Sequence, residues 1–189
     1  MTEATSKKNK KAFVLLILAF ALPVILAKFA LEYDWFNKAA TNKGELLQPP
    51  LDFSGVEQPQ ETPKWRIAYV MPENCEATCD NALYSINQVW VALGKHMDRA
   101  EPVVVVSDSS DAAKVAELNS HPNIKLLKTD VQNVNKVFKQ TSTDGIFLID
   151  TLDNVILRYP LQQEQQQAVL FSRDILADLR KLLKLSRIG

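Results

Sequence analysis

The sequence is poor in glycine, histidine and cysteine and has no net charge, and each shortage excludes a class of protein. Five glycines among 189 residues leave no glycine-rich loop to hold phosphates, so a nucleotide site is not expected. Lysine plus arginine equals aspartate plus glutamate, at 22 each, and basic residues cluster only in the N-terminal tail, so no nucleic-acid partner is expected. The two histidines, His96 and His121, limit any histidine-rich metal site.

The N-terminal part contains a long apolar run at residues 12–31, broken only by Pro23 and Lys28. About 20 apolar residues at about 1.5 Å each are long enough to cross the hydrocarbon core of a membrane. The sequence therefore predicts a tail at residues 1–11 and a single transmembrane anchor at 12–31. A signal peptide cleaved near Ala27 or Ala30 is the alternative.

The two flanks of this run predict its orientation. Four lysines precede it (Lys7, Lys8, Lys10 and Lys11), and acidic and aromatic residues follow it at 32–36. Cytoplasmic flanks carry the excess of lysine and arginine, so the N-terminus is expected in the cytoplasm and the rest of the chain outside it. We expect the bulk of the chain to be extracytoplasmic, in a compartment where disulfides persist.

The soluble part reads as a short connecting segment and one domain. Residues 32–63 contain four prolines and are predicted to form a juxtamembrane stalk and extended segment. Within 64–189, apolar patterning predicts strands at 65–71, 103–106, 124–127, 146–150 and 155–159, and helices at 81–94, 111–118, 131–139 and 165–184. Asp108 or Ser109 is expected to cap the second helix. The last two strands flank a turn centred on Asp153-Asn154, which predicts a hairpin.

The only two cysteines, Cys75 and Cys79, come directly after the first predicted strand and before a predicted helix. A helix N-terminus favours thiolate, the reactive and metal-binding form. Strands that alternate with helices and end in a hairpin indicate an α/β, thioredoxin-like domain: a mixed central sheet flanked by helices, preceded here by a single transmembrane helix.

Several segments resemble the Sco/SenC group of membrane-anchored thioredoxin-like proteins, which serve copper delivery to cytochrome c oxidase. They are Gly44–Leu47 with a following proline, Trp65–Val70, Cys75-Glu76-Ala77-Thr78-Cys79, Phe147–Asp150 and Val155–Tyr159. The most specific of these is Cys-x-x-x-Cys, where ordinary thioredoxins have Cys-x-x-Cys. The resemblance implies a bacterial inner-membrane protein whose periplasmic soluble domain is an accessory in cytochrome c oxidase biogenesis, with an oxidase subunit or another assembly factor as its partner.

The sequence departs from the family at the third copper ligand. Sco-like sites add a histidine just before the strand that corresponds to 146–149, but residues 141–145 here read Thr-Ser-Thr-Asp-Gly. Only Cys75 and Cys79 carry over as catalytic or metal-binding residues. Met71 is a candidate third donor to Cu(I); Met97 and His96 are weaker candidates, and His121 is expected to be an exposed loop residue.

Three interpretations of the cysteine pair therefore stay open. Cys75 can attack as the more exposed thiolate with Cys79 as the resolving thiol, in thiol–disulfide exchange. Both thiolates can hold Cu(I) transiently. The pair can also be a structural disulfide in a non-catalytic, membrane-tethered scaffold. The acidic neighbours Glu73, Glu76 and Asp80 disfavour thiolate and indicate a mild reductant or a metal carrier.

Overall fold

The structure is a computed structural model that describes residues 3–32, 42–56, 62–139 and 141–186. The chain divides into two compact units, Met1–Thr41 and Asn42–Gly189, and each is considered by itself. The acidic and aromatic flank predicted after the anchor falls almost entirely at 33–36, and Pro59 of the extended segment lies at 57–61. Both places are outside the described residues.

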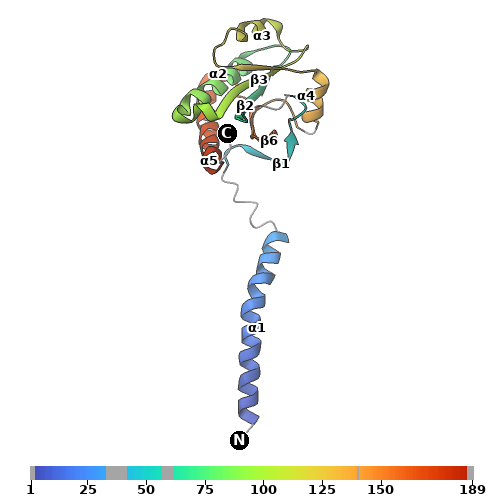
Figure 1. Cartoon of the computed structure of the whole chain (residues 1–189), viewed down its shortest axis with the longest axis vertical. Coiled ribbons are helices and arrows are strands. Elements are labelled where there is room, and N and C mark those ends of the chain that lie inside the picture. Colours follow the sequence, from blue (N-terminus) through green and yellow to red (C-terminus); the bar gives the residue numbers. More distant parts are fainter. Residues whose placement is uncertain (1–2, 33–41, 57–61, 140, 187–189) are drawn as a thin grey trace. The chain divides into compact units, whose positions relative to one another are not determined.

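The first unit contains helix α1 (Glu3–Glu32), with Pro23 inside it (Figure 1). Its apolar stretch, Lys10–Ala30, has 21 residues and a mean hydropathy of 2.6. Large apolar side chains from Phe13 to Phe29 are exposed, which distinguishes α1 from a helix buried in a soluble core. The helix therefore has the length and composition of a membrane span, and a retained anchor and a cleaved signal peptide both meet this criterion.

The second unit is built on a six-stranded mixed sheet with strand order β1-β6-β5-β2-β3-β4. The strands are β1 (Glu45–Asp52), β2 (Trp65–Val70), β3 (Ala100–Val106), β4 (Lys125–Lys128), β5 (Ile146–Ile149) and β6 (Asn154–Tyr159). β2, β3 and β4 run parallel, whereas β5 lies antiparallel to β2, and β6 to β5. This mixed sheet confirms the predicted fold class.

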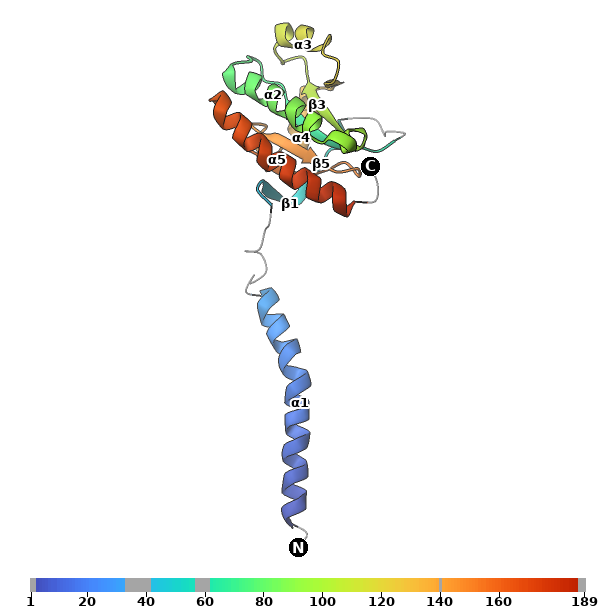
Figure 2. The same cartoon turned by 90° about the vertical axis from the view of Figure 1, so that its left-hand side faces the viewer.

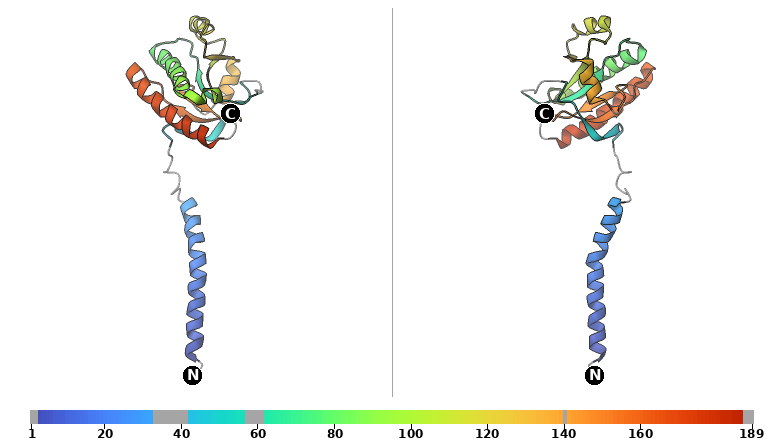
Figure 3. Two further views of the ribbon diagram at one scale, coloured as in Figure 1. Left: turned by 60° about the vertical axis from the view of Figure 1, so that its left-hand side comes forward. Right: turned by 90° about the vertical axis from the view of Figure 1, so that its right-hand side faces the viewer.

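Helices cover both faces of the sheet. Helices α2 (Ala77–Ala92) and α5 (Gln165–Leu185) lie side by side across one face, as Figure 2 shows. Helix α4 (Val131–Val137) covers the opposite face, and α3 (Ala112–Leu118) lies between β3 and β4 in the chain (Figure 3). A 3₁₀ helix, η2 (Gly94–Arg99), follows α2.

Alternating side chains of the central strand β2 separate the hydrophobic core into two clusters. Ile67 and Tyr69 pack in the cluster under α2 and α5, and Ala68 packs in the cluster under α4. This alternation is the period of two of a strand, and β2 is buried on both faces because helices cover both.

The extended segment predicted as a stalk contributes a strand to the sheet. β1 pairs antiparallel with β6 at the sheet edge, and its register shifts between Leu46 and Leu51. Pro49 and Pro50 lie within this irregular stretch, and an edge strand is where proline is tolerated because it has no N–H to donate. The part of this segment from Asn42 therefore belongs to the folded unit.

A buried carboxylate on α5 holds the start of β1. Asp178, 1% exposed, accepts hydrogen bonds from the backbone N–H of Lys43 (2.7 Å) and of Gly44 (3.0 Å), and from the Tyr159 hydroxyl (2.9 Å). A Cβ on Gly44 would lie 2.5 Å from Cζ of Tyr159, so only glycine fits against this ring. Burial, with Asp178 close by, holds the pKa of Tyr159 far above its ordinary value, so the hydroxyl remains a donor.

We expect Asp178→Ala to lower the free energy of unfolding by about 3 kcal/mol, because two backbone N–H groups and one hydroxyl lose a charged acceptor. Urea unfolding of the full chain in detergent, followed by tryptophan fluorescence, measures the change. Asp174→Ala, one turn earlier on the same helix, is the control and should change stability by about 0.5 kcal/mol or less. Equal effects of the two variants would contradict this role of Asp178.

Candidate functional site

The cysteine pair lies where β2 leads into α2. Cys75 is partly exposed in the connecting loop, and Cys79 is 1% exposed in the first turn of α2. Their sulfurs form a disulfide, with a Cα–Cα distance of 5.2 Å. The predicted asymmetry, with Cys75 on the solvent side and Cys79 on the inner side, is present in the structure.

The N-terminus of α2 adds a positive potential at the pair. The helix starts at Ala77, four residues earlier than predicted, and Glu76 is its N-cap without a side-chain cap. The carbonyl of Glu76 accepts from the N–H of Cys79 (2.9 Å) and of Asp80 (3.1 Å), which closes the turn that contains the pair. Helix-terminal N–H groups and the helix dipole favour negative charge on sulfur at this position.

Asp111 connects the cysteine loop to the neighbouring strand–helix loop. One carboxylate oxygen accepts from the N–H of Cys75 (2.9 Å), and the other accepts from the N–H groups of Ala113 and Lys114 (3.0 Å each). The N–H of Asp111 donates to the carbonyl of Pro72 (2.9 Å). The hydrogen bonds to its carboxylate, of which the one from the Cys75 N–H has the largest effect, hold the pKa of the Asp111 carboxyl below its usual range.

The prediction that Asp108 or Ser109 caps this helix was wrong, because Asp111 is the N-cap of α3. The signal in the sequence was an aspartate directly before Ala112-Ala113, an ordinary helix start. Sequence alone could not show that its second oxygen accepts from the N–H of Cys75, since that contact joins the loops after β2 and β3, 36 residues apart in the chain.

A lysine that the sequence did not associate with the cysteines lies close to them. Lys114 Nζ is 2.9 Å from Asp80 Oδ1 and 2.8 Å from Glu117 Oε2. Asp80 Oδ1 in turn lies 3.9 Å from Cys75 Sγ. Hydrogen bonds to Glu117 and Asp80 raise the pKa of Lys114, so it remains a cation. The acidic surroundings inferred from the sequence are therefore partly neutralised at Asp80.

A third sulfur touches the pair from the inner side. Met71, 4% exposed, places its Sδ 3.7 Å from Cys79 Sγ. The other candidate donors are elsewhere: Met97 and His96 lie in η2, beyond the far end of α2, and His121 follows α3 and accepts the N–H of Asn123. Among the sulfur and imidazole donors considered from the sequence, Met71 is the one in contact with a cysteine.

The segment before β5 offers oxygen donors only. In residues 141–145, the Ser142 hydroxyl donates to the Asp144 carboxylate (2.8 Å), and the Arg158 guanidinium donates to the Asp144 carbonyl (2.8 Å). Across the described part of the chain, no group of three or more histidine, cysteine, aspartate and glutamate side chains is arranged to hold a metal ion.

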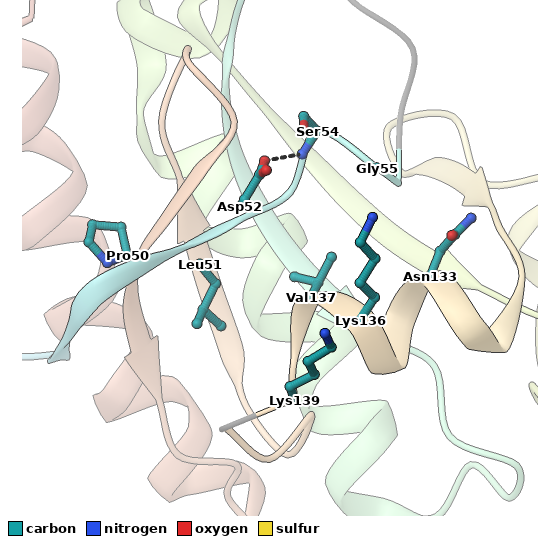
Figure 4. Close-up of a pocket in the computed structure, with 9 residues that line it drawn as sticks. All are labelled: Pro50, Leu51, Asp52, Ser54, Gly55, Asn133, Lys136, Val137 and Lys139. Atoms are coloured by element: carbon teal, nitrogen blue, oxygen red, sulfur yellow. Dashed lines mark hydrogen bonds between the residues drawn. The ribbon is translucent and has the colours of Figure 1, made fainter.

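A separate pocket lies between the end of β1 and α4 (Figure 4). It encloses about 330 Å³, and its polar lining includes Asp52, Ser54, Lys136 and Lys139. Neither cysteine nor Met71 lines it. Hydrogen bonds from Ser54 hold the pKa of Asp52 below its ordinary value, as expected for a carboxylate that closes its own turn. The sulfur site is therefore distinct from this pocket.

A mixed sheet flanked by helices, with two cysteines delivered by a strand–loop–helix turn, defines a thioredoxin-like protein with a Cys-x-x-x-Cys site. Residues 65–186 match the family described as "Transmembrane-like, thioredoxin-like, C-terminal domain", and the chain belongs to that family. No curated protein matches the sequence.

Solved structures share this fold at low sequence identity. Yeast Sco1 with copper bound is 16% identical with a TM-score of 0.50, over 66% of this chain and 81% of that one. ScoI of Bradyrhizobium japonicum with copper bound is 18% identical with a TM-score of 0.41, over 69% and 97%. BsSco, a member of the Sco family of cytochrome c oxidase assembly proteins, is 13% identical with a TM-score of 0.48, over 77% and 96%. The likeness to yeast Sco1 confirms the predicted resemblance at the level of the fold.

We expect the Asp111 carboxyl to titrate below the ordinary aspartate value of about 3.9 and the amide of Cys75 to report it. Because the folded pKa is the lower one, the stabilisation is complete above the unfolded value and is lost as pH falls through the folded value. Amide chemical shifts measured against pH by NMR test this. Asp111→Asn should abolish the pH dependence of the Cys75 amide shift, and Asp108→Asn should leave it unchanged. A midpoint of this amide shift at or above the ordinary aspartate value would contradict the assignment.

Proposed function

We propose that this chain is a membrane-anchored, Sco-like thiol–disulfide exchange protein that acts through Cys75 and Cys79. The observation that carries the proposal is the position of the pair, with an outer sulfur that a partner can reach and an inner sulfur at a helix N-terminus. The sulfurs are close enough to form the disulfide that exchange requires as one end state. A purely structural role is less well supported, since a loop this short contributes little chain entropy.

The reaction is a transfer of two electrons between two sulfur pairs. In the reduced protein, the Cys75 thiolate attacks one sulfur of a partner disulfide, and the other partner sulfur leaves as a thiolate with the electron pair. The Cys79 thiolate then attacks Cys75 Sγ, closing the Cys75–Cys79 disulfide and releasing the second partner sulfur as a thiolate. The partner is reduced and the pair is oxidised, and an external dithiol must reduce it for the next cycle.

The residues around the pair assist these steps. The bond from the Cys75 N–H to Asp111 fixes the loop that presents the attacking sulfur. Lys114 offsets the charge of Asp80, the carboxylate closest to that sulfur, which reduces repulsion of the thiolate. Burial of Cys79 restricts attack by outside thiols, so the resolving sulfur acts on the mixed disulfide.

The helix α1 and the likeness to Sco proteins support a proposal for the compartment and the partner. The proposed location is the bacterial inner membrane, with α1 retained as an anchor and the folded unit in the periplasm. The lysines at residues 7–11, which precede the apolar run, support this orientation because cytoplasmic flanks carry the excess of lysine and arginine. BsSco belongs to a family of cytochrome c oxidase assembly proteins. An oxidase subunit or another assembly factor is therefore the proposed partner of this chain.

We expect Cys79→Ser to accumulate a mixed disulfide with the partner, because the resolving thiol is gone and Cys75 stays bound. Non-reducing gels of membranes, followed by mass spectrometry of the adduct, measure it. Cys75→Ser and the double Cys75→Ser, Cys79→Ser variant should form none. Unimpaired oxidase assembly in the double variant would favour the scaffold and contradict a role for the sulfurs.

A second candidate function is transient binding of Cu(I) by the reduced pair. The observation that favours it is the apolar inner side of the site, where Cys79 is packed in the core cluster that includes residues of α2 and α5. Cu(I) is soft and prefers thiolate and thioether ligands, which this side of the site offers. The fold is also that of yeast Sco1, which has been solved with copper bound.

We expect the reduced full-length chain, in detergent, to bind one Cu(I) in competition with a chromophoric Cu(I) chelator. Cys75→Ser and Cys79→Ser should each abolish competition, and the oxidised protein should not compete because a disulfide offers no thiolate. Absorbance of the chelator complex measures the transfer. Failure of the reduced protein to compete would reject the copper function and leave thiol–disulfide exchange in place.

A further inference from the structure

We propose that Met71 supplies the third ligand of a Cu(I) site formed with reduced Cys75 and Cys79, giving an all-sulfur donor set. This rests on the proposed copper function and deepens it, because the sequence has no histidine at 141–145 to complete such a site.

The backbone of Met71 is fixed on both sides. It follows β2 directly, and its N–H donates to the carbonyl of Val105 (2.9 Å). Its carbonyl accepts from the Ser110 hydroxyl (3.2 Å). The side chain is 4% exposed in the core cluster that also contains Cys79. Met71 is therefore held at the base of the cysteine loop, and its thioether does not depend on a mobile segment for its position.

The distances suit a shared ion. Met71 Sδ lies 3.7 Å from Cys79 Sγ, and Cys79 is bonded to Cys75, so the three sulfurs are grouped together. Because a metal–sulfur bond is about 2.3 Å long, two sulfurs that bind one ion can lie at most about 4.6 Å apart, and Met71 and Cys79 already meet this limit. Reduction of the disulfide would free the Cys75 sulfur to act as a further ligand.

The donor chemistry selects the ion. Two thiolates and a thioether are soft donors that favour Cu(I), whereas calcium and magnesium require oxygen ligands. A neutral thioether adds no charge, so the loaded site carries one net negative charge at the N-terminus of α2, where the helix dipole stabilises it. Two of the three sulfurs are almost fully buried, which protects the bound ion from water and from outside thiols.

A methionine in this position can also simply fill space in the core, since a sulfur contact of 3.7 Å is ordinary packing. The two roles differ in one respect. Packing requires a flexible apolar side chain of the right volume, which leucine supplies, whereas copper binding requires the sulfur atom itself. Met71→Leu separates them, and Met97→Leu is the matched control, because Met97 is packed against the same core cluster and lies at the far end of α2.

We expect Met71→Leu to weaken Cu(I) binding by the reduced full-length chain by about tenfold or more, since loss of even an indirect metal contact commonly costs that much. Met97→Leu should bind as the unmodified protein does. Competition with a chromophoric chelator measures both. In the Cys79→Ser background, Met71→Leu should still trap the partner as a mixed disulfide, because exchange does not use the thioether.

Selenomethionine provides a readout that is independent of stability. The chain has three methionines, Met1, Met71 and Met97. X-ray absorption at the selenium edge of the labelled, Cu(I)-loaded protein should show copper at bonding distance. That signal should persist in Met97→Leu and vanish in Met71→Leu.

Three outcomes are distinguishable. Weaker binding in Met71→Leu together with a selenium–copper signal supports the proposal. Equal binding in both leucine variants without that signal overturns the role of Met71 and leaves the copper function intact. No binding by the unmodified, reduced protein overturns both, and thiol–disulfide exchange then remains as the function of the pair.

Discussion

The parallel pairing of β2 with β3 is the constraint on which the functional site depends. It brings the carboxyl ends of both strands to the same edge of the sheet. The loop after β2, which carries Cys75, therefore lies beside the loop after β3, which ends in Asp111. Hydrogen bonds from Met71 to Val105 and from Ser110 to Met71 extend this pairing beyond the strands themselves. The sulfur pair is therefore supported by backbone on two sides, and its geometry does not depend on the disulfide alone.

The charge around the pair follows from the same arrangement. Three acidic residues adjoin the cysteines in the sequence, and taken alone they would oppose a thiolate. Helix α3, capped by Asp111, brings Lys114 against Asp80, while Glu73 and Glu76 remain exposed to solvent. Water and salt screen exposed charges strongly, and the helix dipole of α2 acts at the sulfurs themselves. The balance at Cys75 is therefore more favourable to thiolate than the sequence indicates.

Local patterns in the sequence were sufficient to predict the fold, but they could not predict the contacts between segments that are distant in the chain. Buried strands such as 103–106, the hairpin at Asp153-Asn154 and the amphipathic last helix follow from hydrophobic periodicity and turn chemistry, and the structure confirms each. The pairing of β1 with β6 was not predicted, since its two prolines indicate a loop unless the strand is known to lie at an edge. Cys75, Cys79 and Met71 were identifiable because they are close in the sequence. Asp111 and Lys114 were not, because only the β2–β3 pairing brings them to the cysteines.

Exchange and copper binding, as proposed, are two uses of one reduced state. Cu(I) needs both thiolates, and the disulfide removes both, so a single oxidation of the pair releases any bound ion and ends its capacity to reduce a partner. Conversely, bound Cu(I) occupies the Cys75 sulfur and blocks its attack on a partner disulfide. In this proposal Met71 is the ligand that distinguishes the two uses, because it has no part in exchange. A soft third donor on the buried side would stabilise the copper-bound state without altering the sulfur that faces a partner, so the two proposed activities could be adjusted separately within one short loop.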